Sequence, residues 1–335
     1  MTASSSSFES MLPIAVDVMG ADKGPQEIIK GALFAYEKYG IPIILVGDPA
    51  VIGDSSPFEV IPALEVIEMH DEPASAVRRK QDASVLKAAE AVRDGRACAM
   101  VSPGNTGAAM VSALWRIGRI KGISRPAIAT PLPLPSGDHT ILLDAGANVD
   151  CSASWLAQFG QMGSVFAKTR FGLANPKVGL LSNGEEDSKG NSLVKQTHEI
   201  LKQLTNLNFI GNVEGGDLLL GAADVVVTDG FTGNIVLKAL EGSLKVFLNS
   251  FMSVIASTEQ SRQAGEILFP LLQPIIKKMD PESTGGAMLL GIDGVCIISH
   301  GSSSSVAISN AVVTARDMVS AKLVQEIKNS ISSIE

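Results

Sequence analysis

VGLLSNGEEDSKGNSLVKQTHEI, residues 178–200, is the stretch that decides the fold class. It opens with an apolar run, breaks into a polar loop that contains Lys189, and resumes with apolar residues at helical spacing behind Asn191. The pattern predicts a buried strand, a polar turn and a helix N-terminus. Because a helix start has unpaired backbone N–H groups and partial positive charge, a lysine just before it favours an anion site. Taken alone, the stretch is explained equally well by a capped helix with a solvated loop.

The same order of apolar strand, small polar loop and helix recurs along the chain. Loops rich in Gly, Asn, Ser or Asp occupy 102–107, 229–234 and 300–305, as the polar loop does at 182–191. This alternation predicts an α/β fold with a mostly parallel sheet that helices cover on both faces. In such sheets ligands bind at the carboxyl ends of the strands. We therefore expect these loops to gather at one edge, around a shared anion-binding cleft.

Further elements follow from the same periodicities. An antiparallel pair is expected from 127–132 and 140–144. The other expected strands are 13–17, 42–47, 63–67, 97–101, 208–211, 225–228 and 295–299. The other expected helices are 26–39, 84–93, 108–117, 152–171 and one that begins at 235.

Composition narrows the class of protein. The 335 residues carry a formal net charge of −8, with 45% apolar and 4% aromatic residues, which disfavours nucleic-acid binding. Three widely spaced cysteines, Cys98, Cys151 and Cys296, are typical of a reducing cytoplasm. We predict a disordered lead over residues 1–12, without a signal peptide, and a single α/β/α domain over 13–335. No apolar stretch reaches the roughly 20 residues of a membrane span.

Several well-known site motifs are missing from the loops. There is no G-x-G-x-x-G after the first strand, no Walker loop and no G-x-S-x-G nucleophile elbow. The acidic triplet at residues 185–187 is more typical of a helix start than of a metal site. We therefore expect no cofactor and no metal, and an anion held without a covalent enzyme intermediate.

Eight segments, in order, resemble the motifs of one known family, the bacterial phosphate acyltransferases of phospholipid synthesis (acyl-ACP:phosphate transacylases). They are VDVMGADKGP (16–25), VSPGNTGAAM (101–110), LLDAGANVD (142–150), GLLSNGEEDSKGN (179–191), GNVEGGDLL (211–219), ADVVVTDGFTGNIVLK (223–238), GGAMLLGIDG (285–294) and HGSSS (300–304). The resemblance is collinear over about residues 13–320. The chain departs from the usual family residues at Ala21, Pro103, Met288 and Ser304.

The resemblance implies a cytoplasmic homodimer with a Rossmann-like three-layer α/β/α fold. It implies transfer of a fatty acyl group from acyl carrier protein to inorganic phosphate, with the acyl phosphate passing to a glycerol-phosphate acyltransferase. Peripheral contact with the inner face of the membrane is a further implication. Two alternatives stay open: a phosphate acyltransferase that uses a CoA donor, and a non-enzymatic phosphate-sensing or membrane-scaffold protein.

Phosphate is already a nucleophile and a thioester has a good leaving group, so this reaction needs positioning and oxyanion stabilisation rather than a catalytic serine. The predicted catalytic residues are Lys189, His300 and Asn234. Lys189 is expected to contact phosphate or the developing negative charge, and His300 to protonate the departing thiolate or to cap its turn. The predicted substrate-binding residues are Asp17, Asn105, Thr106, Asn148, Asn191, Asp229 and Ser302. Among these, the two aspartates are expected to shape loops, and Asn148 and Asn191 are ligands or caps.

Two further features concern partners. Arg116, Arg119, Lys121 and Arg125 form a basic cluster near a predicted helix end. The cluster is either a docking site for acidic acyl carrier protein or a complement to the helix dipole. Residues 244–280 predict a projecting helical hairpin, with Pro270 and Pro274 as breakers, whose apolar side chains suit a dimer interface or membrane contact.

Overall fold

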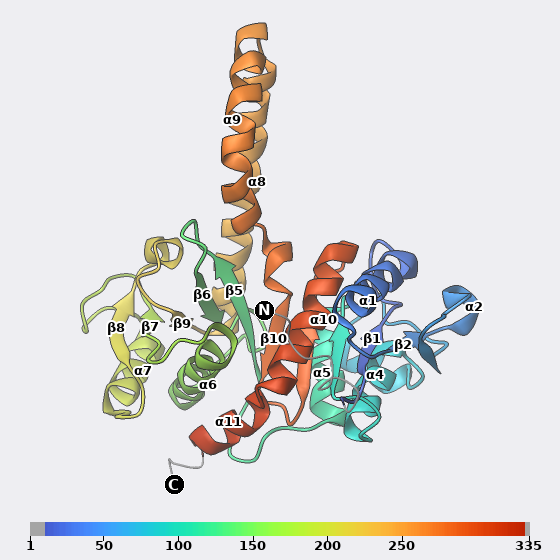
Figure 1. The fold of residues 1–335 in the computed structure, drawn as a ribbon. Helices are drawn as coiled ribbons and strands as arrows, with labels where there is room; N and C mark the ends of the chain where they lie inside the picture. The colour runs from blue at the N-terminus through green and yellow to red at the C-terminus, as the bar shows by residue number, and fades with distance from the viewer. Residues whose placement is uncertain (1–10, 332–335) are drawn as a thin grey trace.

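The strands pair into an open eleven-stranded sheet with helices on both faces (Figure 1). The computed structural model describes residues 11–331, so the predicted lead at residues 1–10 lies outside the described part. The sheet order is β3-β2-β1-β4-β11-β10-β5-β6-β9-β7-β8. The strands are β1 Ile14–Asp17, β2 Ile43–Gly47, β3 Glu59–Pro62, β4 Ala99–Ser102, β5 Ala127–Pro133, β6 His139–Leu143, β7 Val178–Leu181, β8 Phe209–Val213, β9 Val225–Val227, β10 Ala287–Leu290 and β11 Val295–Ile298.

Helices follow most strands, as the alternation predicts. The α-helices are α1 Pro25–Tyr39, α2 Pro49–Ile52, α3 Pro73–Arg79, α4 Ser84–Arg93, α5 Thr106–Arg116, α6 Ala153–Phe171, α7 Ser192–Gln203, α8 Gly230–Ala256, α9 Glu259–Lys278, α10 Ser305–Ser320 and α11 Leu323–Ile331, and the 3₁₀ turns are η1 Gly215–Leu219 and η2 Pro281–Thr284. The predicted mostly parallel α/β sheet and the predicted antiparallel β5–β6 pair are confirmed.

Alternating side chains of the central strands enter two different cores. Ile14 and Val16 of β1 belong to one buried apolar cluster, whereas Ala15, between them in sequence, belongs to another. Since successive side chains of a strand point to opposite faces, a strand covered on both sides must be apolar throughout. This explains why the sequence pattern of the strands is a continuous apolar run rather than an alternation.

The expectation that the polar loops gather at one edge is wrong, because the sheet changes direction in its middle. The strand β10, which the sequence pattern did not predict, pairs antiparallel with both β11 and β5. The antiparallel β5–β6 pair reverses the direction again. As a result β1, β4 and β11 end at one edge, called here the first edge, and β6, β9 and β7 end at the other, the second edge.

The strand predicted at residues 63–67 lies instead at Glu59–Pro62. The physical reason is the length of its partner, since β3 is an edge strand that pairs only with β2 and β2 ends at Gly47, opposite Pro62. Beyond this point the backbone N–H of Leu64 turns to the carboxylate of Asp82, at 2.9 Å. After Ala63, whose N–H donates to the Gly47 carbonyl oxygen at 3.0 Å, the pairing is reduced to an isolated bridge between Glu65 and Ala83.

The helices α8 and α9 form the projecting hairpin that the sequence predicts (Figure 1). The turn lies at Ser257 and Thr258, where Thr258 and Ser261 form a reciprocal capping box. Pro270 and Pro274 lie inside α9, so their predicted role as breakers is wrong. By length and composition α8 could cross a membrane, which is weak evidence from a single helix.

Candidate functional site

The first edge brings together the loops at 17–24, 102–107 and 300–305, called here the first loop cluster. The backbone N–H of Asp22 donates to the carbonyl oxygen of Gly301 at 2.9 Å, which joins two of these loops. Asp17 is buried and accepts hydrogen bonds from the Ser102 hydroxyl at 2.7 Å and the Met19 N–H at 3.1 Å. Burial raises the pKa of Asp17, and these hydrogen bonds oppose the rise. Asp17 therefore holds the loop at 17–24 against Ser102.

The side chain of Asn105 forms hydrogen bonds that hold the loops of the first loop cluster in place. Its Oδ1 accepts from the N–H of Ala108 at 3.0 Å and caps α5, while Nδ2 donates to the carbonyl oxygens of Glu68, Met69 and Asp71 at 3.1–3.2 Å. A side chain with these partners positions a loop. Thr106, the next residue, is exposed at the first turn of α5.

His300 and Ser302 form an exposed pair at the end of β11. Nδ1 of His300 lies 2.8 Å from the Ser302 hydroxyl oxygen and accepts from the Ser302 backbone N–H at 3.2 Å. A neutral ring whose Nδ1 accepts an N–H carries its proton on Nε2. The pair therefore orients Nε2 of His300 as a hydrogen-bond donor.

The second edge brings together the loops at 144–150, 182–191 and 229–234, called here the second loop cluster. At its centre is Asp144, a buried residue that the sequence reasoning did not single out. Its Oδ1 accepts from the N–H groups of Ile128, Gly146 and Ala147, and its Oδ2 accepts from the backbone and side-chain nitrogens of Asn148. Burial raises the pKa of Asp144, against these bonds. The signal in the sequence is an Asp at a strand end before a turn of small residues that contains Gly146.

Asn148 links this loop to the strand beside it and to α8. Its Nδ2 donates to the Pro126 carbonyl oxygen at 2.8 Å, and its own carbonyl accepts from the Gly230 N–H at 2.8 Å. Asp229 caps α8 by accepting from the Thr232 N–H at 2.8 Å. Asn148 and Asp229 therefore shape the start of α8.

Asn234 lies in the first turn of α8 and is exposed toward the loop at 144–150. A Cβ atom added at Gly146 would lie 3.5 Å from the Asn234 Cβ. A Cβ added at Gly233 would overlap the carbonyl oxygen of Asp144. The α8 N-terminus can pack this closely under the loop only because residue 233 is glycine.

Lys189 stands on the loop between β7 and α7, with 45% of its side chain exposed. Its nearest carboxylate is Glu186, 3.9 Å away and itself exposed, which makes a weak ion pair. The loop is ordered by the Gly190 N–H, which donates to Asn183 Oδ1 at 2.9 Å, and by Asn191, which caps α7 through the Val194 N–H. The backbone at Lys189 is therefore held in place, while the ammonium group of Lys189 makes only this weak ion pair.

The adjacent acidic residues turn to different partners. Asp187 lies 3.1 Å from Lys202 and 3.3 Å from Nε2 of His198, and the hydrogen bond from Lys202 lowers the pKa of Asp187. Within residues 11–331 no group of three His, Cys, Asp or Glu side chains is placed to hold a metal ion. Asp187 therefore fastens the loop to α7.

The sequence comparisons decide the family. Residues 12–326 match the profile of the family described as "Fatty acid synthesis protein". The chain belongs to this family. A relative from Pelotomaculum thermopropionicum named "Phosphate acyltransferase" is 48% identical over 331 residues, 97% of this chain and 96% of its own length. One of the same name from Bacillus subtilis is 48% identical over 322 residues, 93% of this chain and 97% of its own. The resemblance inferred from the motifs is confirmed.

Solved structures show the same fold at low sequence identity. A phosphotransacetylase from Streptococcus pyogenes has a TM-score of 0.62 and 18% identity, and the match covers 95% of this chain and 97% of that one. A branched-chain phosphotransacylase from Enterococcus faecalis has a TM-score of 0.58 and 15% identity, with 92% and 99% covered. These likenesses establish the Rossmann-type α/β architecture for this member of the fatty acid synthesis protein family.

The predicted site residues of this family member fall into two sets. Asp17, Asn105, Thr106, His300 and Ser302 lie in the first loop cluster. The second loop cluster contains Asn148, Lys189, Asn191, Asp229 and Asn234. The three predicted catalytic residues are therefore divided, because His300 follows β11 whereas Lys189 and Asn234 follow β7 and β9.

None of the three cysteines is poised as a nucleophile. Burial raises the pKa of Cys98 to about 11 and that of Cys151 and Cys296 to about 12. A thiol with such a pKa stays protonated near neutral pH and is a poor nucleophile.

Proposed function

We propose that this protein transfers a fatty acyl group from acyl carrier protein to inorganic phosphate, forming acyl phosphate for phospholipid synthesis in the cytoplasm. The observation that carries the proposal is the set of relatives named "Phosphate acyltransferase", which are 44–48% identical over nearly the whole chain. The fold shared with phosphotransacylases is consistent with it. The class of reaction is an acyl transfer to phosphate.

The second loop cluster supports a phosphate site best. Three helices with capped N-termini, α6, α7 and α8, follow the strands β6, β7 and β9. All three strands end at the second edge. Helix N-termini present backbone N–H groups and positive potential, which suit an oxyanion. In this proposal Lys189 supplies the cation, and Asn234 donates to phosphate or to the tetrahedral oxyanion.

The proposed reaction then needs only phosphate, the acyl thioester and the side chains and backbone N–H groups of this protein. A phosphate oxygen attacks the thioester carbonyl carbon, the tetrahedral intermediate collapses, and the carbon–sulfur bond breaks to release the carrier's thiolate. Lys189 and the helix N-termini favour the extra negative charge of the intermediate. His300 lies at the other edge of the sheet from this loop cluster. In this proposal the thiolate therefore takes its proton from solvent, and His300 caps its own turn through Ser302.

One assay tests the proposed function. Purified protein is incubated with palmitoyl-acyl carrier protein and inorganic phosphate, and acyl phosphate is trapped as the hydroxamate. We expect phosphate-dependent hydroxamate from this donor at a higher kcat/KM than from palmitoyl-CoA. A preference for palmitoyl-CoA would support the CoA-dependent alternative, and no product from either donor would support a non-enzymatic scaffold.

The hairpin is the proposed homodimer and membrane element. Its exposed apolar side chains include Val246, Phe247, Ile267 and Leu271, each at least 66% exposed in the isolated chain. A second hairpin would cover such surface and so stabilise a homodimer. Leu271→Glu is expected to convert the dimer to a monomer in light scattering. A dimer that persists while liposome co-sedimentation is lost would assign this surface to the inner membrane face instead, where a glycerol-phosphate acyltransferase could receive the product.

A further inference from the structure

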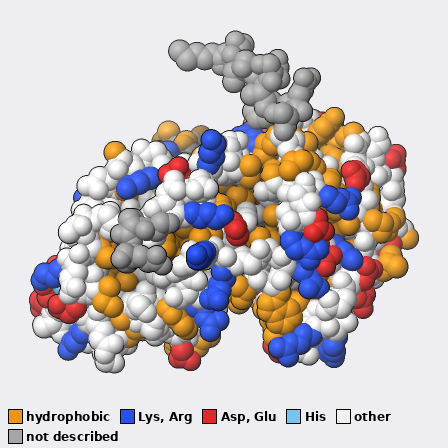
Figure 2. Space-filling view, turned by 90° about the horizontal axis from the view of Figure 1, so that it is seen from below, with side chains coloured by type: hydrophobic (Ala, Val, Ile, Leu, Met, Phe, Trp, Pro, Cys, Tyr) orange, Lys and Arg blue, Asp and Glu red, His pale blue; other side chains and the backbone are white. Residues whose placement is uncertain are grey.

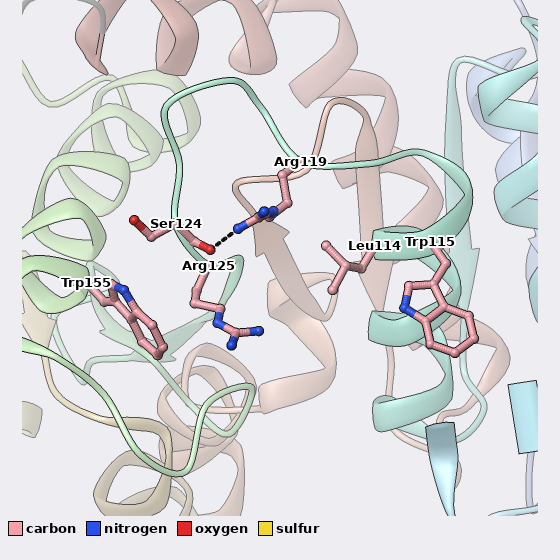
Figure 3. Close-up of a pocket in the computed structure, with 6 residues that line it drawn as sticks. All are labelled: Leu114, Trp115, Arg119, Ser124, Arg125 and Trp155. Carbon is pink, nitrogen blue, oxygen red and sulfur yellow. Dashed lines mark hydrogen bonds between the residues drawn. The ribbon is translucent and has the colours of Figure 1, made fainter. Parts of the chain in front are cut away.

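The lower face of the molecule has a groove that the proposed chemistry does not use. It is about 630 Å³ in volume and is lined by Leu114, Trp115, Arg119, Ser124, Arg125 and Trp155 (Figure 3). One wall is the C-terminal part of α5, and the other is the strand entry at Arg125 with the first turn of α6. The groove therefore spans the two halves of the sheet.

The groove is basic although the chain is acidic. None of its described lining residues is acidic, and two arginines, Arg119 and Arg125, lie between the two tryptophans (Figure 3). The guanidinium of Arg125 lies 4.9 Å from the ring centroid of Trp155, and that of Arg78 lies 5.4 Å from the ring centroid of Trp115. Lys and Arg side chains flank the hollowed middle of this face in Figure 2. In a protein of net charge −8, this is a local concentration of positive charge suited to an acidic partner.

The groove also offers apolar anchors. Both tryptophans of the chain, Trp115 and Trp155, line it, and Trp115 is 42% exposed. Tryptophan and arginine are the residues most enriched among energetically dominant interface positions. Indoles flanked by guanidiniums suit an amphipathic helix with acidic and aliphatic side chains on one face.

The structure revises the basic cluster expected from the sequence. Arg116 is held by Glu90 at 3.0 Å and by the side-chain oxygen of Gln81 at 2.6 Å, on the side of α4. Arg119 donates to the Ser124 carbonyl oxygen, which keeps it at the groove (Figure 3). Arg78, 38 residues earlier in the chain than Arg116, joins through its contact with Trp115. The surface is therefore built by tertiary packing.

The groove borders the second loop cluster. Pro126, next to Arg125, accepts from Asn148 Nδ2 at 2.8 Å, and the N–H of Ile128 donates to Asp144 at 3.0 Å. Ser124 is fastened to α6, because its N–H donates to Gln158 Oε1 at 2.9 Å. A partner seated in the groove is thus adjacent to the loops assigned to phosphate.

We propose that this groove is the docking surface for the acidic, helical carrier protein that brings the acyl thioester, with Trp115 and Trp155 as anchors and Arg119 and Arg125 as charge partners. The inference rests on the proposed function, since that function supplies an acidic protein as acyl donor. Docking here brings the carrier next to the loop at 144–150, which bonds to the start of α8. Ionic strength should weaken binding, because exposed charge pairs are screened by salt.

Intrinsic fluorescence tests the docking directly, because the only tryptophans in the sequence line the groove. The probe is holo-acyl carrier protein without tryptophan, titrated into the full-length protein. We expect a saturable change of tryptophan emission, and Arg119→Glu/Arg125→Glu to raise the Kd at least tenfold. The matched control is Lys168→Glu, an exposed lysine far along α6, with an unchanged Kd. A Kd that is unchanged in the double variant overturns the proposal.

Further measurements separate this inference from the proposed function. If the wild type forms acyl phosphate but the double variant keeps its KM for acyl carrier protein, the docking surface is wrong and the function stands. If the wild type binds carrier protein in the groove but forms no acyl phosphate, the function fails and the docking stands. Arg125→Lys is expected to restore most of the affinity, which shows that charge rather than misfolding is responsible. Emission that changes only with the protein's own concentration would assign the groove to a second copy and overturn the proposal.

Discussion

The two loop clusters are similar in sequence composition but different in structure. In the first, polar side chains mostly bond to one another: Asp17 to Ser102, and Ser304 to Glu282 at 2.6 Å. In the second, buried Asp144 organises the backbone of its loop, while Lys189 and Asn234 remain exposed. The comparison shows that Gly, Asn and Ser after a strand are not sufficient evidence of a ligand site. What distinguishes a candidate site is a hydrogen-bonded backbone that leaves some polar side chains exposed and free to bind a ligand.

Gly233→Ala attacks the frame of the second loop cluster and is expected to have the largest effect. The new methyl group overlaps the Asp144 carbonyl oxygen, so α8 must move away from the loop. Overpacking against backbone costs about 3 kcal/mol, and acyl phosphate formation should be lost. Urea unfolding measures the change. Gly242→Ala, in the same helix with open space around it, should instead stabilise by about 0.5–1 kcal/mol. Equal stabilities of the two variants would show that the close contact between Gly233 and Asp144 does not hold the second loop cluster in place.

Lys189→Ala tests the uncommitted cation of the second loop cluster. We expect turnover to fall at least tenfold, which corresponds to about 1.4 kcal/mol of transition-state stabilisation, with the unfolding midpoint unchanged. Lys195→Ala, an exposed lysine of α7, serves as control and should retain full turnover. A near-normal rate in the Lys189 variant would exclude this lysine from the mechanism.

His300→Ala asks whether the first loop cluster takes part in the transfer. Because His300 lies at the other edge of the sheet from Lys189, its loss should matter less, and we expect at most about a fivefold decrease in kcat. Steady-state kinetics of His300→Ala and Lys189→Ala, measured side by side, show which edge of the sheet contributes more to kcat. His70→Ala, another exposed histidine near the first edge, is the control. A larger loss from His300 than from Lys189 would reverse the proposed assignment and place the chemistry at the first edge.

Asp17→Asn should have the smallest effect, and on stability rather than turnover. Burial raises the pKa of Asp17 in the folded protein above its ordinary value of 3.8. The folded state therefore binds the proton more tightly than the unfolded state, and the resulting stability is lost as pH rises from about 4 through the folded pKa. The stability of Asp17→Asn relative to wild type should rise over that range and then level off. A difference that does not vary with pH would show that Asp17 is not perturbed.

Much of the fold was predictable, because continuous apolar runs and helix caps depend on residues that are close together in the sequence. The stretch 178–200 became β7, an ordered loop and α7, with Asn191 as the cap. The missed strand β10 is short and follows two glycines in the left-handed region, Gly285 and Gly286, so local propensity gave little signal. Its antiparallel position depends on its partners β11 and β5, and β5 is distant from it in the sequence. Together with the antiparallel β5–β6 pair, this insertion divided the predicted site residues between two edges.

The sequence by itself determined the fold class, the family and the kinds of side chain that end each strand, because these depend on periodicity, turn chemistry and motif order along the chain. Only the tertiary structure decided which of those side chains meet. It made Asp144 a buried centre with five hydrogen bonds, tied Arg116 to Glu90 and brought Arg78 beside Trp115. The physical reason is that strand direction and burial are set by partners distant in sequence, and the hydrogen bonds that consume or spare a polar group depend on those partners.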